Sequence, residues 1–273
     1  MDISYNFGDY YNYPMETIMK TIAIVTGASS GIGKQFVKLL LKEQEIDEIW
    51  AIARNQQKLQ NLRKKAGHKI ITYSLDLSRA ASIAEFEHIL KEKTPNIKYL
   101  VNSAGYAKFC TYKDLSIQET VNMIDLNCSG VVSMSLASIP YMGRGSHIIN
   151  LASQAAFQPL PYQNVYSSTK AFVRNYSRAL NVELKGTGIS VTAVCPGWVR
   201  TALYDRAMIG AKKATNKFVG MVSPDKVAAK ALRDAKSNKD ISVYGIHTKL
   251  LHVAAKILPQ RMVMKIWLMQ QNL

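Results

Sequence analysis

Short apolar segments rich in β-branched residues alternate with longer amphipathic segments along most of the chain. The apolar segments have the length of strands that are buried on both faces, and the amphipathic segments have helical spacing. We expect strands at residues 21–26, 48–53, 69–75, 97–101, 147–151, 189–194 and 240–244, with helices at 34–43, 56–65, 80–93, 117–142 and 166–185 and from Ser223 onward. Because parallel neighbours need helical crossovers, this alternation predicts an α/β fold, a doubly wound parallel sheet of about seven strands.

The pattern divides the chain into three parts. Residues 1–19 have no period, no basic segment and no apolar core of the signal-peptide kind, and we expect a loose leader. Residues 20–245 carry the alternation and are predicted to form one domain. Residues 246–273 are predicted to be an amphipathic helical extension that Pro259 interrupts. No run of 18 apolar residues occurs, so we expect no transmembrane helix.

Candidate chemistry is densest between residues 148 and 170. Tyr166 and Lys170 are four apart in a helical segment and therefore share one helix face. A neighbouring ammonium favours phenolate, so we expect the pKa of Tyr166 to fall from about 10 toward neutrality. Such a tyrosine can exchange a proton with an alcohol oxygen, to which Ser153 could also bond. The alternative is a packed tyrosine beside a solvated lysine, since this two-residue spacing is common.

A glycine-rich turn, Gly27 to Gly33, follows the first predicted strand and precedes a helix. Such a turn lets the backbone approach a pyrophosphate, which the helix N-terminus also favours. The alternative of an ordinary tight turn is weakened by this strand-turn-helix context. Arg54 ends the second strand about 20 residues later, where an acid would select NAD and an arginine accommodates the 2′-phosphate of NADP. We therefore favour NADP(H) over NAD(H), the alternative being a solvated Arg54.

The net charge of +16 comes from 35 basic and 19 acidic residues, and the region from Arg206 to Leu273 holds 13 basic and three acidic ones. No nucleic-acid-binding module is recognisable, so we expect no nucleic-acid partner. The charge indicates solvated surface, or attraction to anionic cofactors, substrates or lipid headgroups. Three widely spaced cysteines and five scattered histidines predict neither disulfides nor a metal site, and a reducing compartment such as the cytoplasm fits.

Taken together, these residues give the chain a resemblance to the short-chain dehydrogenase/reductase family over roughly residues 20–245. The motifs are TGASSGIG at 26–33, Asp76-Leu77, NSAG at 102–105, Asn127, Ser153, YSSTK at 166–170 and PGWVRT at 196–201. Each motif is weak alone, but their order and spacing together are specific. Ser103 replaces a usual asparagine, and Ser30 stands where many NADP-using members have a basic residue, so Arg54 alone supports NADP.

The resemblance implies a Rossmann-type catalytic domain with four catalytic residues. Tyr166 would be the general acid/base and Ser153 would orient the substrate oxygen. Lys170 would bond the nicotinamide ribose and lower the pKa of the tyrosine, and Asn127 would hold a water that connects Lys170 to solvent. The implied cofactor contacts are Gly27, Ser29, Ser30, Gly31, Ile32, Gly33, Arg54, Asp76, Leu77, Asn102, Ala104, Gly105, Tyr166, Lys170, Pro196, Gly197, Val199 and Thr201.

Substrate choice is expected in the segments after residues 105, 153 and 203. Candidate substrate residues are Gln154, Phe157, Tyr162, Tyr204 and Met208. An apolar lining with methionine suits a lipophilic alcohol or ketone such as a hydroxysteroid, bile-acid types included, although each residue could instead belong to the core. Similar extensions occur in hydroxysteroid- and oxoacyl-reducing relatives.

We therefore expect an NADP(H)-dependent oxidoreductase that acts on a secondary alcohol or ketone. Alternatives are a 3-oxoacyl or general carbonyl reductase, or a non-catalytic NADP-binding scaffold or sensor. The basic extension could cover the substrate pocket, form a subunit interface in a homodimer or homotetramer, or make a peripheral membrane contact.

Overall fold

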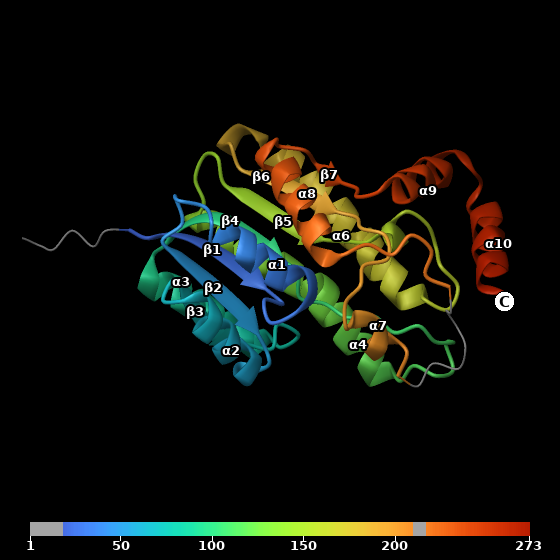
Figure 1. Cartoon of the computed structure of the whole chain (residues 1–273), viewed down its shortest axis with the longest axis horizontal. Helices are drawn as coiled ribbons and strands as arrows, with labels where there is room; N and C mark the ends of the chain where they lie inside the picture. The colour runs from blue at the N-terminus through green and yellow to red at the C-terminus, as the bar shows by residue number, and fades with distance from the viewer. Residues whose placement is uncertain (1–18, 210–216) are drawn as a thin grey trace, which may run out of the picture.

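A seven-stranded, wholly parallel sheet forms the centre of the computed structural model, which describes residues 19–209 and 217–273. The strands are β1 (Thr21–Thr26), β2 (Glu48–Ala53), β3 (Ile70–Ser74), β4 (Asn96–Asn102), β5 (His147–Leu151), β6 (Ser190–Val194) and β7 (Ile241–Ser242). Their order across the sheet is β3-β2-β1-β4-β5-β6-β7 (Figure 1). The expected doubly wound α/β fold is confirmed.

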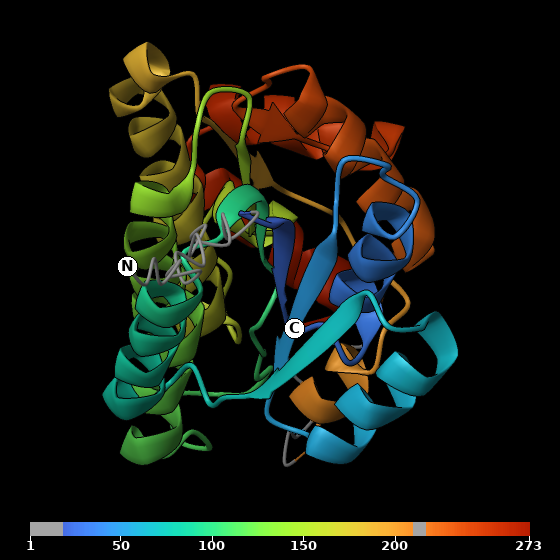
Figure 2. The ribbon, with the colours of Figure 1, turned by 90° about the vertical axis from the view of Figure 1, so that its left-hand side faces the viewer.

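Helices cover both faces of the sheet. One layer contains α1 (Gly31–Leu40), α2 (Gln56–Ala66) and α8 (Pro224–Lys236), and the other contains α3 (Ala80–Lys93), α4 (Ile117–Ile124), α5 (Gly130–Ser138) and α6 (Asn164–Glu183). Figure 2 shows the sheet between these layers. Side chains alternate accordingly: Ile22 and Ile24 face the α6 layer, and Ala23 and Val25 face the α1 layer. Both faces of β1 are therefore buried, as its composition predicts.

The strand order reverses at β1, which lies between β2 and β4. In an open parallel sheet, ligands bind at the carboxyl ends of the strands beside such a switch point. The glycine turn follows β1, and the Asn102–Gly105 segment follows β4. The fold therefore brings these two motifs to the same edge of the sheet.

The helix expected over 117–142 is confirmed in its extent, because helical turns run without a break from Ile117 to Tyr141, but it is not a uniform α-helix. The segment forms α4, a π-helical turn (Asp125–Ser129), α5 and a 3-10 turn (Ile139–Tyr141). The wider turn contains Asn127, and Gly130 follows it at a crowded position, where a Cβ would lie 2.9 Å from the carbonyl oxygen of Leu77. Such π-turns often mark functional sites.

The structure also bears on two other expected segments, the last strand and the leader. Strand β7 covers only residues 241 and 242 of the five expected. The expected leader lies outside the described residues except for Met19. A short helix, α7 (Leu203–Ala207), follows the PGWVRT motif. Two helices, α9 (Ile246–Ile257) and α10 (Gln260–Gln271), follow β7. Of the helices in the described residues, none combines the length and hydropathy needed to cross a bilayer.

Candidate active site

A cavity of about 330 Å³ lies at the carboxyl ends of β1, β4, β5 and β6. It combines residues from several separate parts of the chain, including the glycine turn, the NSAG segment, the Ser153 loop, α6 and the PGWVRT motif. Of the predicted catalytic residues, Ser153, Tyr166 and Lys170 line it. The fold thus assembles in one place the chemistry that the sequence distributes over nearly 180 residues.

Ser153 is positioned by the end of β5, where the backbone turns into a 3-10 helix (Gln154–Ala156). Its hydroxyl accepts a hydrogen bond from the backbone N–H of Ala155 at 3.2 Å. Tyr166 lies in the first turn of α6 with only 9 % of its surface exposed. Its ring meets that of Phe109 edge-on, with centroids 6.1 Å apart. Ser153 and Tyr166 both line the cavity, and the Ser153 hydroxyl acts on the phenol as a hydrogen-bonding neighbour that lowers its pKa.

The expectation of a lowered tyrosine pKa is wrong for this structure. Burial raises the pKa of Tyr166, because removal from water disfavours the phenolate, and the hydrogen bond with Ser153 acts in the opposite direction but less strongly. Lys170 lies on the same helix face, as expected, with its Nζ 5.8 Å from the centroid of the tyrosine ring. Proximity alone therefore does not fix the direction of the shift, because burial affects both groups.

Lys170 is a buried cation held by the backbone. Its Nζ donates a hydrogen bond of 2.7 Å to the carbonyl oxygen of Leu151. Burial lowers the pKa of Lys170 from 10.5 to about 8. A Cβ on Gly105 would lie 3.6 Å from this Nζ and 2.8 Å from Oδ1 of Asn127, so only a glycine lets these groups come together.

Asn127 does not line the cavity, because its amide is paired inside the protein. Oδ1 accepts from the backbone N–H of Tyr106 at 3.1 Å, and Nδ2 donates to the Tyr106 carbonyl oxygen at 3.0 Å and to Oγ1 of Thr169 at 3.1 Å. These bonds tie the π-turn to the loop after β4 and to α6. The water-holding role remains a proposal.

Replacing Lys170 by methionine is expected to change how stability depends on pH. Above about pH 8 the folded protein has released a proton that the unfolded chain keeps to about 10.5, so unfolding takes up a proton. The free energy of unfolding of the wild type should therefore rise between these values, by up to about 3 kcal/mol relative to Lys170→Met. Urea unfolding across this range measures the two slopes.

The exposed Lys185→Met is the matched control, and it should keep the wild-type slope. Burial raises the pKa values of the Cys128 and Cys195 thiols to about 11 and about 12, and Lys170 lowers both. Loss of the lysine can therefore only lower the slope of Lys170→Met further, which widens the expected difference and does not reverse it. Equal slopes for the wild type and Lys170→Met would contradict a depressed lysine pKa.

The glycine turn has the close packing that a dinucleotide-binding loop requires. Gly27 has a φ of +64°, and a Cβ there would lie 2.9 Å from backbone atoms of Ser103 and Ala104. Thr26 Oγ1 accepts from the backbone N–H of both residues at 3.0 Å. A Cβ on Gly33 would lie 2.5 Å from the Gly27 carbonyl oxygen. Helix α1 therefore begins tightly against the turn, and the Ser30 side chain makes no capping bond to its N-terminal N–H groups.

A second cavity of about 520 Å³ continues from the first past the end of β2, and three cations line it: Arg54, Lys58 and Arg206. The Arg54 side chain is 44 % exposed, and its ion pair with Asp76 is long, at 4.0 Å. Its guanidinium is therefore available for further contacts. Arg206 lies over the Tyr106 ring at 4.5 Å. The sequence analysis missed Lys58 and Arg206. For Lys58 a signal was present, since it follows Arg54 by four residues into α2.

The other predicted cofactor residues divide into two groups. Those that line one of the two cavities are Gly27, Ser29, Ser30, Gly31, Ile32, Arg54, Leu77, Ala104, Gly105, Tyr166, Lys170, Pro196, Gly197, Val199 and Thr201. Gly33, Asp76 and Asn102 line neither. Asn102 is buried and donates through Nδ2 to Asn150 Oδ1 at 2.9 Å, so it joins β4 to β5. Asp76 accepts hydrogen bonds from the backbone and hydroxyl of Ser78.

Of the five candidate substrate residues, Gln154 and Tyr204 line the main cavity, and the other three do not. Phe157 packs on His252 of α9, with ring centroids 4.0 Å apart. Tyr162 has a φ of +66°, and Met208 packs against the core. These three were chosen for their apolar character, which core packing requires equally.

The apolar wall of the cavity is mainly aromatic. Tyr106, Phe109, Leu160, Trp198 and Tyr204 line it. Trp198 meets Tyr204 at 5.5 Å and Phe218 at 5.0 Å between centroids. One polar group stands out on this side, because Oε1 of Gln154 is buried without a hydrogen-bond partner among the described residues. Within the described residues, no group of three or more His, Cys, Asp or Glu has a metal-binding arrangement.

Comparisons with known proteins point to one family. A family model described as short chain dehydrogenase matches residues 21–209. An uncharacterized oxidoreductase of Staphylococcus epidermidis is 32 % identical over 201 residues, which cover 73 % of this chain and 86 % of that protein. A short-chain dehydrogenase from Sphingobium yanoikuyae in complex with NADPH has a TM-score of 0.74 and 27 % identity, covering 87 % of this chain and 92 % of that one. The closed form of serine dehydrogenase complexed with NADP+ has a TM-score of 0.69 and 30 % identity, with coverages of 82 % and 94 %.

Proposed function

The chain belongs to the short-chain dehydrogenase family of nicotinamide-dependent oxidoreductases, and on this premise we propose that it is an NADP(H)-dependent enzyme for a lipophilic secondary alcohol or ketone. The observation that carries the proposal is the cavity that Ser153, Tyr166 and Lys170 line together with several aromatic side chains. Its cationic continuation at Arg54 supports the choice of nucleotide.

In this mechanism, Tyr166 and Ser153 act on the substrate oxygen. The nicotinamide nucleotide, when bound, supplies the hydride in reduction and accepts it in oxidation. During reduction the Tyr166 hydroxyl donates its proton to the carbonyl oxygen while the Ser153 hydroxyl donates a hydrogen bond to the same atom. Protonated Lys170, held at Leu151, stabilises the phenolate that Tyr166 becomes. Oxidation reverses the proton transfer.

The preference for NADP(H) rests on the cations beyond β2. Arg54, Lys58 and Arg206 line a cavity that opens from the glycine turn, and a phosphate is well matched to such a group. No acidic residue directly follows β2 to bond a ribose 2′-hydroxyl. The NADPH and NADP+ complexes named above agree with this choice, although structures with NADH also occur among relatives of lower identity.

A lipophilic substrate is proposed from the aromatic wall. Aromatic rings and a leucine in the cavity lining suit an apolar carbon skeleton, and the unpaired Gln154 oxygen would accept one hydrogen bond from a substrate donor. A hydroxysteroid is one such substrate, and a 3-oxoacyl group or another bulky carbonyl compound is the alternative.

A non-catalytic NADP-binding scaffold or sensor is the candidate of another class. It would need the glycine turn and Arg54 but not the Ser153–Tyr166 pair, which nothing in a binding role requires. Retention of that pair in the cavity favours catalysis.

The test is a panel of steroid, acyl and simple aliphatic ketones and alcohols, each assayed with NADPH or NADP+ and with NADH or NAD+. We expect the 340 nm absorbance of the reduced nicotinamide to change with at least one bulky apolar compound, and faster with the phosphorylated nucleotide. Tight NADPH binding with no turnover across the panel would favour the scaffold instead.

Three proposals concern partners and location. A homodimer or homotetramer is supported by exposed apolar side chains on α4, where Ile117, Val121 and Ile124 recur at helical spacing. A reducing compartment such as the cytoplasm is supported by Cys110, Cys128 and Cys195, which are buried and free. A peripheral membrane contact of the basic extension is the third proposal, and the outer faces of α9 and α10 carry it.

A further inference from the structure

Helix α9 exposes an apolar stripe that the domain does not cover. Ile246, Leu250, Val253 and Ile257 are spaced by four, three and four residues, so they lie along one side of the helix. Each is between 50 % and 75 % exposed. The helix already has a face for the domain, because Thr248 is buried and His252 packs on Phe157. The packing of α9 on the domain therefore does not use the stripe.

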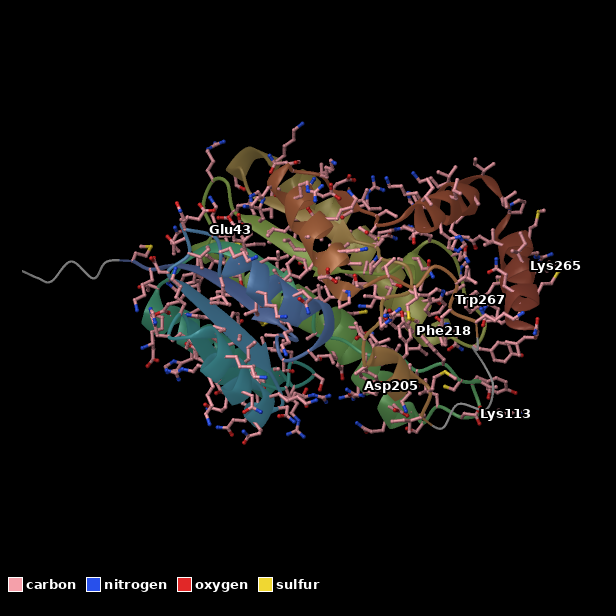
Figure 3. All side chains as sticks on the ribbon, viewed as in Figure 1. Glu43, Lys113, Asp205, Phe218, Lys265 and Trp267 are labelled. Carbon is pink, nitrogen blue, oxygen red and sulfur yellow. The ribbon has the colours of Figure 1, made fainter. Side chains whose placement is uncertain are left out.

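Helix α10 repeats this division. Val263, Trp267 and Gln271 form its inner face. Trp267 donates from Nε1 to the Pro161 carbonyl oxygen at 3.1 Å and stacks on Trp198 at 6.3 Å. Met262 and Met269 are exposed on the outer face. Figure 3 shows Trp267 on the side of α10 toward the domain and Lys265 on the side away from it.

The charges beside these apolar residues are all positive. Lys249, Lys256, Arg261 and Lys265 lie on α9 and α10, and residues 245–273 contain no aspartate or glutamate. All four are exposed, and none forms an ion pair with any residue in the described part of the chain. The exposed apolar residues are thus bordered by four cations, unpaired within the described residues, and anionic groups would complement them.

We propose that the outer faces of α9 and α10 form a docking surface for an anionic lipid bilayer, on which the helices lie in the headgroup plane. Apolar side chains would enter the acyl boundary while the four cations meet lipid phosphates. Each helix has 12 residues, too few to cross a bilayer. A second copy of the chain fits less well, since a twofold contact would set the same cations against one another.

Helix α10 lies between the docking surface and the wall of the cavity. Trp267, on the inner side of α10, packs against Trp198 in the cavity wall, and Gln271 bonds both backbone groups of Lys217, which leads to Phe218. Docking would therefore place the cavity near a reservoir of apolar molecules. This consequence rests on the proposed function, whereas bilayer binding itself does not.

Vesicle flotation with the full chain tests the proposal without any substrate. The wild type should float with phosphatidylcholine vesicles that contain phosphatidylglycerol, and not with phosphatidylcholine alone, and salt should weaken the binding. Lys249→Gln/Lys256→Gln/Lys265→Gln should lower the partition coefficient roughly 100-fold. Leu250→Ser/Ile257→Ser should lower it at least about tenfold.

Controls separate this result from a folding defect or a general charge effect. Lys64→Gln/Lys65→Gln/Lys91→Gln removes three exposed lysines from α2 and α3, and Val182→Ser removes an exposed apolar residue from α6. Both should float like the wild type, and all variants should keep the wild-type melting temperature. Absence of wild-type flotation, or equal loss with the α2 and α3 variant, would overturn the proposal. So would a stripe variant that dissociates an oligomer in light scattering while vesicles stay unbound.

Discussion

Replacing Tyr166 by phenylalanine is expected to lower kcat by about 10²- to 10⁴-fold, the usual contribution of a positioned general acid or base. The change removes one oxygen and leaves the ring, which packs edge-on against Phe109. Nucleotide binding should persist, because the glycine turn, Arg54 and Lys170 are unchanged. The measurements are initial rates at 340 nm with the active compound of the panel, and the Kd of NADPH by fluorescence titration.

Tyr176→Phe is the matched control for this variant. Tyr176 lies further along the same helix and does not line the cavity, so its kcat should stay within about twofold of the wild type. A Tyr166→Phe enzyme that turns over at the wild-type rate would remove the phenol from the mechanism. A parallel loss of NADPH binding would instead indicate that the hydroxyl holds the nucleotide.

The sheet was predictable because the residue composition of its strands shows that they are buried. Thr21–Thr26 was located to the residue, since both of its faces are covered and every interior position is therefore small or apolar. The order across the switch point then follows from right-handed crossovers and short connections. The placement of Ser153 and Tyr166 at one end of adjoining elements follows in turn from that order.

The π-turn at Asp125–Ser129 was not predictable from helical periodicity. One extra residue per turn leaves the apolar spacing on either side almost intact, and its cause is distant in the sequence. Asn127 pairs with the backbone of Tyr106, and Gly130 passes close to Leu77. Neither contact leaves a mark in the sequence between Ile117 and Met142.

The cavity walls were predicted only in part, for a related reason. Trp198 packs against Trp267, nearly 70 residues later in the chain. The cations of the second cavity, Lys58 of α2 and Arg206 of α7, are about 150 residues apart. Helical spacing correctly placed Lys170 beside Tyr166, but the direction of the pKa shift depends on burial, which follows from the packing of the whole fold. The local sequence pattern thus predicted which side chains lie beside Tyr166 but not how deeply they are buried.

Replacing Arg54 by aspartate is expected to reverse the nucleotide preference. Hydrogen bonds to a charged group contribute about 1.5–3 kcal/mol, so losing the guanidinium should weaken NADPH binding roughly 10- to 150-fold. The new carboxylate would repel a 2′-phosphate and bond a ribose 2′-hydroxyl, which should improve the Kd of NADH. The fold should not suffer, since the ion pair with Asp76 is long and partly exposed. Titrations of both nucleotides give the ratio of the two Kd values.

Arg63→Asp makes the same charge change near the other end of α2, away from both cavities, and controls for the general field of the protein. It should leave the ratio of Kd values within about twofold of the wild type, because an exposed charge more than a Debye length away is screened. If Arg54→Asp weakens NADPH and NADH equally, the arginine does not contact a 2′-phosphate. Selectivity would then have to come from Lys58 and Arg206, whose alanine variants should lower only NADPH affinity. Preference for NADP(H) is thus assigned to single cations, independently of whether Tyr166 turns substrate over.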